Sequence, residues 1–426
     1  MTRLQDIAAQ LSGYDPSALS VAKAQEFIAR LVPRVTAVES LPLRSALGRV
    51  LARDIVSPIN VPASDNSAMD GYALRSSELR ASGPSDFGVA GTSFAGEAFD
   101  GVAAPGQCVR IMTGAVMPDR FDTVVPQEFV QLTADGTVTV PAGVVRSGDN
   151  RRLAGEDLRL GEPALQAGRV LRPADLGLMA SLGRAEVPVF RRLRVAFFST
   201  GDELRSVGES LDEGCVYDSN RYTLWGMLQR LGVELIDMGV VPDEPEALEA
   251  TFRAAAENAD AVITSGGVSV GEADHTKQVM ARIGDVLFWK IAMRPGRPMA
   301  IGRIESNGRQ AILFGLPGNP VAVMVTFYAF VRDALLAMSG AASCPLPILR
   351  AATTEAIRKK AGRTEYQRGI VSRAADGSLQ VAITGSQGSG ILRSMSVANG
   401  LVVLHHEQGN VEAGGWVDVL PFDGLV

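Results

Sequence analysis

The sequence predicts a multidomain α/β protein whose central domain is a doubly wound, mostly parallel sheet. Between residues 193 and 340, apolar strand-like runs alternate with helical stretches, and glycine- or acid-rich loops follow most of the strands. This repeated order is typical of a parallel sheet with helices on both faces. At roughly 100–200 residues per domain, the chain of 426 residues also has room for further domains. The expected strands and helices are residues 194–198, 220–231, 233–241, 245–258, 261–264, 286–292, 299–304, 311–314 and 319–339.

The segments on either side of this domain lack its repeated order of strands and helices. Residues 1–19 read as a loosely structured lead-in, and Ser20 is placed to cap a helix whose apolar residues recur every three or four positions. Residues 348–426 read as short strands that form a small β-barrel or sandwich. We therefore expect a linker domain of residues 20–50 and 150–192, an inserted β-rich domain of residues 51–149, an α/β domain of residues 193–340, and a C-terminal β-barrel domain of residues 345–426.

Composition and charge exclude several classes of protein. Lys and Arg total 41 against 47 Asp and Glu, a net charge of −6, whereas proteins that coat nucleic acid normally carry the opposite balance. The three cysteines are too few and too scattered for a disulfide framework or a four-thiolate zinc site. The first twenty residues show no apolar signal-peptide core, and the apolar stretch 321–331 is shorter than the ~20 residues of a membrane span. We therefore expect a cytoplasmic protein that binds neither nucleic acid nor membrane.

Loops at the ends of the expected strands should converge on one crevice, because ligands of open parallel sheets bind outside the carboxyl ends of the strands. Successive glycines let backbone N–H groups approach and cradle an oxyanion. Lys290, Arg294 and Arg297 add cationic donors, which suits phosphate or another tetrahedral oxyanion. One such loop could be a bare turn, but several at one sheet edge favour a binding site. The loops are STGDE (199–203), VVPDE (240–244), SGGVSVGEAD (265–274), RPGRP (294–298) and GLPGNP (315–320).

The same crevice collects the carboxylates Glu203, Asp243 and Asp274. Oxygen ligands without histidine or thiolate suit Mg²⁺, which binds proteins through one or two carboxylates plus substrate phosphates. For Asp243, capping of the following helix is an equally good explanation. Residues 267–271 match the G-x-S-x-G pattern of serine hydrolases, but the helix that must follow that elbow is missing, so Ser269 is better explained as an oxyanion ligand. No Walker motif or opening GxGxxG supports a nucleotide-binding enzyme of those types.

Three motifs before the α/β domain carry polar residues in turn-like settings, and each alone is explained as a local turn. They are DNSAMDGYA (65–73), RIMTGA (110–115) and GEDL (155–158). Followed in order by STGDEL, DSNR (218–221), SGGVSVGEAD, FWKIAMRPGRP (288–298), GLPGNP and GSQGSG (385–390), they form a specific set. The set resembles the molybdopterin molybdotransferase family, the MoeA proteins and the gephyrin E domain, from about residue 20 to the C-terminus.

This resemblance implies an elongated homodimer whose active site lies between the molybdopterin-binding α/β domain of one subunit and the N-terminal domains of the other. It also implies a reaction in which adenylylated molybdopterin and molybdate, with Mg²⁺, give molybdenum cofactor and AMP. By motif, the implied catalytic residues are Asp70, Thr113, Asp157, Glu203, Asp243 and Asp274, of which Glu203, Asp243 and Asp274 are the implied metal ligands. The implied substrate-binding residues are Ser269, Lys290, Arg294, Arg297, Pro317, Pro320, Arg368 and Ser389.

Two departures from the family pattern and two other functions stay open at this point. Family members often carry Lys where this chain has Arg294 and Arg297, and Thr where it has Ser219; arginine keeps the charge but changes the donor geometry. The alternatives are a molybdopterin adenylyltransferase, which uses the same type of α/β domain, and a non-catalytic pterin carrier or scaffold. The expected partners are the upstream adenylyltransferase and downstream cofactor-handling proteins. The sequence does not decide between molybdate and tungstate.

Overall fold

The central sheet has the predicted parallel arrangement. The computed structural model describes residues 3–268, 275–343 and 345–422. The sheet consists of β13 (Arg194–Thr200), β16 (Glu234–Val241), β17 (Ala261–Ser265), β18 (Gly284–Lys290), β20 (Pro298–Ser306) and β21 (Arg309–Leu316). In the order β16-β13-β17-β21-β20-β18, the strands from β16 to β21 are parallel, and β20 and β18 are antiparallel to their neighbours. Asn307 and Gly308, both with positive φ, form the tight turn that makes β20 and β21 antiparallel.

Helices cover both faces of this sheet, as predicted for a doubly wound fold. Side chains alternate along β13, so Val195 and Phe197 join one hydrophobic core while Ala196 and Phe198 join the other. The first face carries α1 (Leu4–Ala9), α2 (Val21–Leu31), α4 (Ser219–Leu231), α7 (Pro320–Thr326) and α8 (Arg332–Met338). The second face carries α5 (Pro245–Asn258) and α6 (His275–Ile283).

The N-terminal segment corrects one prediction, because residues 3–19 are structured rather than a loose lead-in. Leu4, Ile7 and Leu11 recur at helical spacing, and each is at most 5% exposed. They pack in the same core as α2, so both N-terminal helices join the central domain. With only six residues, α1 was too short to give a clear periodic signal.

The helices α7 and α8 form one helical run, Pro320–Met338, through a π-helical turn at Phe327–Val331. This run has 19 residues and a mean hydropathy of 1.7, so by length and composition alone it could cross a membrane. However, 78% of its apolar window is buried inside the protein, which is typical of the core helix of a folded domain. Its N-terminus follows β21 and therefore lies at the carboxyl edge of the sheet.

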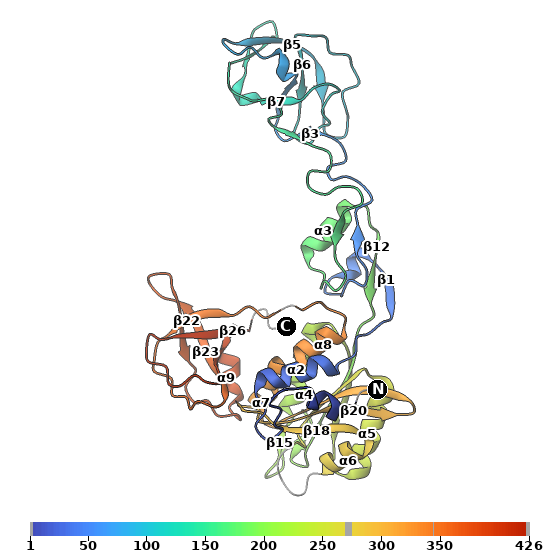
Figure 1. Ribbon diagram of the computed structural model, residues 1–426, viewed down its shortest axis with the longest axis vertical. Coiled ribbons are helices and arrows are strands. Elements are labelled where there is room, and N and C mark those ends of the chain that lie inside the picture. The colour runs from blue at the N-terminus through green and yellow to red at the C-terminus, as the bar shows by residue number, and fades with distance from the viewer. Residues whose placement is uncertain (1–2, 269–274, 344, 423–426) are drawn as a thin grey trace.

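The remaining N-terminal regions extend away from this domain, which makes the molecule elongated (Figure 1). Nearest the central domain, α3 (Pro173–Ser181) packs with the pair β1 (Val38–Pro42) and β12 (Glu186–Phe190) around a separate core. The pairs β2 (Ile55–Val56) with β11 (Pro163–Leu165), and β3 (Asn66–Ser67) with β10 (Arg151–Arg152), lead outward. The far end is a β-rich region of β4 (Gly71–Leu74), β5 (Ser85–Ser93), β6 (Gln107–Ile111), β7 (Thr123–Pro126), β8 (Gln131–Leu132) and β9 (Val138–Val140).

The C-terminal region forms a closed barrel, which decides between the barrel and the sandwich. Its strands are β22 (Leu349–Thr353), β23 (Thr364–Arg373), β24 (Leu379–Ile383), β25 (Gly400–Leu404) and β26 (Trp416–Pro421). The order β23-β24-β22-β26-β25 closes because β25 also pairs with β23. A short strand, β19 (Met293–Arg294), pairs with β23 and ties the barrel to the central domain. The barrel loop 384–391, between β24 and α9 (Leu392–Val397), thereby reaches the edge of the central sheet.

Candidate active site

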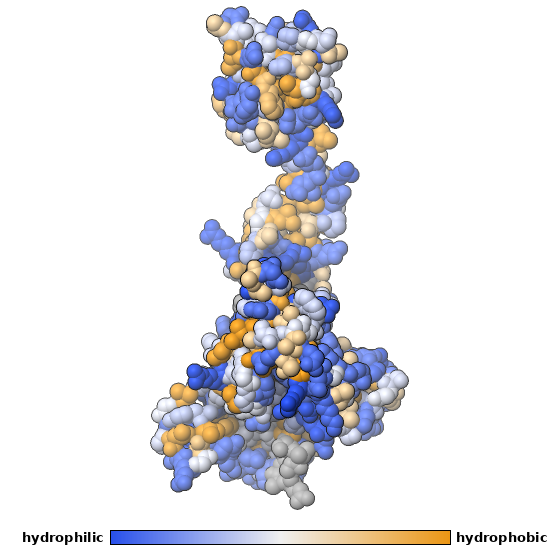
Figure 2. Space-filling view, turned by 90° about the vertical axis from the view of Figure 1, so that its left-hand side faces the viewer, coloured by the Kyte–Doolittle hydropathy of each residue, from blue (hydrophilic) through white to orange (hydrophobic). Residues whose placement is uncertain are grey.

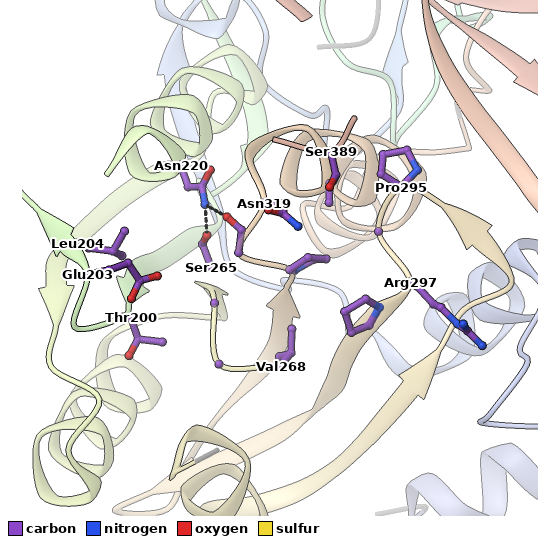
Figure 3. A pocket seen from close by; sticks show the side chains of 18 of the residues that line it. Thr200, Glu203, Leu204, Asn220, Ser265, Val268, Pro295, Arg297, Asn319 and Ser389 are labelled. Atoms are coloured by element: carbon purple, nitrogen blue, oxygen red, sulfur yellow. Dashed lines mark hydrogen bonds between the residues drawn. The ribbon is translucent and has the colours of Figure 1, made fainter. Parts of the chain in front are cut away.

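A cavity of about 900 Å³ opens at the carboxyl edge of the central sheet. The ends of β13, β17 and β21, the loop before α5, residues 294–298 and the barrel loop all contribute to its wall (Figure 3). Within the described part of the chain, the predicted convergence of the strand-end loops is therefore confirmed. A cavity of this size can hold a ligand as large as a cofactor. The predicted site residues that line it are Glu203, Asp243, Arg294, Arg297, Pro317 and Ser389.

Glycines form the floor of this cavity because the backbone segments approach too closely for side chains. Gly266 has a φ of 97°, and a Cβ atom there would lie 2.5 Å from the carbonyl oxygen of Thr200. Gly267 has a φ of 66°, and its Cβ atom would overlap the side chain of Thr276 on α6. The cavity wall after β17 is therefore bare backbone, the arrangement in which N–H groups can bind an oxyanion.

The start of α4 joins this floor to the helix layer. The Asp218 side chain caps α4 and also accepts a hydrogen bond of 3.0 Å from the hydroxyl of Ser199 on β13. Two residues later, Nδ2 of Asn220 donates to Oγ of Ser265 and to the carbonyl oxygen of Gly318, at 2.7 Å each (Figure 3). The DSNR motif therefore anchors α4 to three neighbouring strand ends.

Two arginines supply the positive charge at the cavity. Arg294 and Arg297 both line it, and both side chains are exposed. Arg294 belongs to β19, so the pairing of that strand with the barrel fixes its backbone. Lys290, at the end of β18, is exposed but is not among the lining residues, and its backbone bonds to Pro16 and Leu19. Of the three predicted cationic side chains, Arg294 and Arg297 therefore line the cavity and Lys290 does not.

Arg368 is fully buried beneath the barrel loop and does not line the cavity. Its guanidinium donates to the carbonyl oxygens of residues 386–388 at 2.9–3.3 Å and to the hydroxyl of Ser394 at 2.9 Å. Burial, reinforced by the charge of Arg294, lowers the pKa of Arg368 to about 10, so the group is charged at neutral pH. Arg368 therefore holds the loop that carries Ser389.

The barrel loop meets the first turn of α7. Ser389 lines the cavity, and its carbonyl oxygen accepts the N–H of Val321 at 3.1 Å. Pro317 lines the cavity, whereas Pro320 is the first residue of α7, where its missing N–H costs no helical hydrogen bond. Asn319 caps α7 without a side-chain hydrogen bond to the helix, so its amide group is available at the cavity wall.

Two carboxylates line the cavity, and their chemistry fits Mg²⁺. Oδ1 of Asp243 accepts a hydrogen bond of 3.3 Å from the hydroxyl of Thr276, and Glu203 follows the end of β13. Glu244, rather than Asp243, is the N-cap residue of α5, so the capping explanation for Asp243 is wrong. Among the described residues no group of three or more His, Cys, Asp or Glu side chains could hold a metal ion. A Mg²⁺ ion on Glu203 and Asp243 would therefore also need water or substrate oxygens, as is common for this ion.

Among the described residues, Asp70, Thr113 and Asp157 are not brought to this cavity within one chain. Asp70 precedes β4 and Thr113 follows β6, in the β-rich region that Figure 1 shows far from the central sheet. The backbone N–H and the hydroxyl of Thr113 both donate to Oδ1 of Asp70 at 2.7 Å, and these bonds hold the pKa of Asp70 below its ordinary value. Asp157 lies near the pair β2–β11, between the two ends of the molecule. Ser269 and Asp274 lie outside the described residues.

Sequence reasoning did not single out Asn220, Asn319 and Gln387, which also line the cavity. They lie in the motifs DSNR, GLPGNP and GSQGSG, so their positions along the chain were informative. A polar side chain at the start of a helix that follows a parallel strand faces the ligand edge, which is the signal that could have found Asn220 and Asn319. For Gln387 no such signal exists, because its place depends on how the barrel docks.

The fold and the cavity define an α/β protein with arginines and carboxylates around a cavity at its strand ends, a long β-rich arm and a C-terminal barrel. The chain matches the MoeA N-terminal region (domain I and II) over residues 19–183. It matches a probable molybdopterin binding domain over residues 196–337 and the MoeA C-terminal region (domain IV) over residues 350–422. These three matches follow one another along nearly the whole chain.

Individual relatives agree with this classification. The chain is 44% identical, over 96% of its length, to the whole of the molybdopterin molybdenumtransferase of Haemophilus influenzae. It is 35% identical, over 94% of its length, to 93% of the molybdopterin molybdenumtransferase of a Nostoc species. The crystal structure of the molybdopterin biosynthesis moeA protein of Pyrococcus horikoshii matches 95% of this chain and all of that chain, with a TM-score of 0.81 at 27% identity. The chain therefore belongs to the molybdopterin molybdenumtransferase (MoeA) family, as the resemblance predicted.

Proposed function

We propose that this protein is a molybdopterin molybdenumtransferase, an enzyme of molybdenum cofactor biosynthesis that inserts molybdate into adenylylated molybdopterin and releases AMP. The observation that supports this proposal is the cavity, whose wall combines two arginines, a glycine floor and two carboxylates. Both substrates are anions, so cationic donors must neutralise them before they can approach each other. Family membership supplies the identity of the substrates, and the cavity supplies the groups that such substrates need.

In this proposal the arginines bind the oxyanions. The planar guanidinium groups of Arg294 and Arg297 each offer paired donors, which match the oxygens of phosphate and molybdate. The glycine backbone after β17 adds N–H groups, and Asn319 and Ser389, from the neighbouring α7 and barrel loop, orient the substrate. Arg368 acts one step away, because it fixes the barrel loop. No observation in the structure favours the adenylyltransferase or the carrier alternative.

We also propose Mg²⁺ as the cofactor, held by Glu203, Asp243 and Asp274. When bound, the ion would polarise the pyrophosphate linkage of the adenylylated substrate for cleavage. The chain's own part is to hold the carboxylates in place, and the hydroxyl of Thr276 does so for one oxygen of Asp243. The acidic pair and the two arginines then face the substrate from different segments of the cavity wall.

The proposal includes a homodimer in which Asp70, Thr113 and Asp157 complete the site of the partner copy. Support comes from Figure 1, in which the β-rich arm lies far from the central sheet whose edge forms the cavity. Figure 2 shows apolar residues on the surface of the narrow segment that leads to this arm, where Ile59 and Leu160 are 41% and 63% exposed. A second copy would cover this surface. We expect this dimer in the cytoplasm, where the adenylyltransferase would deliver the substrate.

The test is the release of AMP in response to molybdate. Purified protein is incubated with adenylylated molybdopterin and Mg²⁺, and AMP is measured by chromatography before and after molybdate is added. The proposal expects molybdate-dependent AMP release together with active cofactor, and tungstate in place of molybdate measures the preference between the two oxyanions. If molybdate does not raise AMP release, the proposed function is wrong. AMP transfer from ATP to free molybdopterin would instead identify an adenylyltransferase.

A further inference from the structure

The side chain of Asn220 crosses between two loops of the cavity floor. It is 7% exposed, lies in the first turn of α4 and donates both hydrogens of Nδ2, to Ser265 and to the carbonyl oxygen of Gly318. Ser265 is the last residue of β17, and Gly318 lies in the loop between β21 and α7. The two bonds therefore connect α4 to the ends of two adjacent parallel strands.

Beyond the strand ends, this side chain replaces the hydrogen bonds of the sheet. Ser265 pairs with Leu316 at the end of the ladder, and the N–H of Gly266 still donates to the carbonyl oxygen of Leu316 at 3.1 Å. The chain then turns away into the GLPGNP loop, and the carbonyl oxygen of Gly318 points back to Asn220. The hydrogen bond from Asn220 on α4 therefore fixes the position of the peptide group between Gly318 and Asn319.

The acceptor end of the same amide is unsatisfied. Oδ1 of Asn220 is buried and has no hydrogen-bond partner in the described part of the chain. A buried acceptor without a partner lowers stability, and such groups in native proteins call for an explanation beyond stability. The two hydrogen bonds from Nδ2 provide that explanation, because they can form only when Oδ1 points away from both loops.

We infer that Asn220 is a positioning residue for the substrate. By holding the Gly318 carbonyl oxygen, it fixes Asn319 and the first turn of α7 at the cavity wall. Asn319 makes no side-chain cap and is free to contact the substrate, so its placement bears directly on substrate binding. This inference rests on the proposed function and adds to it a residue that acts through the loop rather than on the reacting atoms.

The test compares isosteric variants by their kinetics. Asn220→Asp keeps the shape but turns an oxygen toward the carbonyl oxygen of Gly318, which cannot donate, and Asn220→Ala removes both bonds. We expect the KM for adenylylated molybdopterin in AMP release to rise about 10- to 100-fold in both, with a smaller change in kcat, because the binding loop is displaced. The matched control is Asn258→Asp on the surface of α5, where Nδ2 bonds only to Ala254 within its own helix; its KM should equal that of the wild type.

Further measurements separate positioning from a merely structural role. A lower midpoint of thermal unfolding with an unchanged KM for the folded protein would overturn the inference, and so would unchanged kinetics in both variants. If neither Asn220 variant folds, Ser265→Ala removes one acceptor with little change in shape and should raise KM in the same direction; an unchanged KM there overturns the inference. The wild-type protein is assayed first. If it shows no molybdate-dependent AMP release, the proposed function is wrong. If the wild type is active and the variants have the same KM, only the inference about Asn220 is wrong.

Discussion

Replacing Arg368 with methionine tests whether this residue supports the barrel loop. The guanidinium is fully buried and makes four hydrogen bonds, three of them to backbone carbonyl oxygens of residues 386–388. Methionine fills a similar volume but offers no donor. The carbonyl oxygens of residues 386–388 would then lose these donors, and the same loop carries Ser389 at the cavity wall. Both the stability of the barrel and the binding of substrate should therefore decrease.

The size of the effect follows from the lost bonds. At about 1 kcal/mol net for each hydrogen bond, four bonds give about 4 kcal/mol as an upper value. Removing a buried charge returns part of its desolvation cost, which is also the main reason that the pKa of Arg368 is lowered to about 10. We therefore expect the free energy of unfolding to fall by about 2–3 kcal/mol.

Urea unfolding followed by circular dichroism measures this change. The matched control is Arg373→Met at the exposed end of the same strand, β23, which should change the free energy of unfolding by less than about 0.5 kcal/mol. The KM for adenylylated molybdopterin should rise in Arg368→Met and stay constant in the control. If Arg368→Met is as stable as the control and binds substrate as well, the role derived for Arg368 is wrong.

Three further changes have definite expected outcomes. In Thr113→Val the pKa of Asp70 should rise toward its ordinary value, because the hydrogen bond from the Thr113 hydroxyl that lowers it is lost. As the pH falls, Asp70 should therefore become protonated at a higher pH in the variant than in the wild type. An NMR titration of Asp70 measures this shift; an unchanged pKa would contradict the expectation. Gly267→Ala should destabilise by about 1–3 kcal/mol more than Gly183→Ala, because both have φ near 70° but only Gly267 faces a neighbouring side chain; equal thermal shifts would contradict this. Asp243→Asn should raise the Mg²⁺ concentration needed for half-maximal AMP release and weaken Mn²⁺ binding measured by electron paramagnetic resonance; unchanged metal binding would remove Asp243 from the metal site.

The parts of the fold that the sequence predicts well are those in which one pattern implies one geometry. Strand–loop–helix repeats imply parallel strands, and parallel strands place their following loops at one edge, so the meeting of Glu203, Asp243 and Pro317 could be foreseen. The barrel could not be separated from a sandwich, because short strands do not reveal that β25 returns to pair with β23. The domain boundaries stay a prediction, although α2 packs into the core of the central domain rather than with the linker region.

The parts of the site that the sequence could not predict depend on contacts between distant segments. The motif context of Arg368 suggests a substrate contact, but its burial follows from how the barrel loop folds over β23. Asn220 acts on Gly318 across 98 positions of sequence, a relation that no local pattern contains. For Asp70 the motif gives the residue but not the subunit in which it acts, since only the proposed homodimer would bring it to a cavity.

Mixing two inactive variants tests the central claim most directly. Asp70→Asn disables the arm and Asp243→Asn disables the cavity, so each homodimer should lack molybdate-dependent AMP release. After subunit exchange about half of the dimers contain one copy of each variant, and each of these has one intact site, so the mixture should regain about a quarter of the wild-type activity. If the mixture stays inactive while exchange is shown to occur, or if Asp70→Asn alone keeps full activity, a site shared between the cavity of one copy and the arm of the other is contradicted.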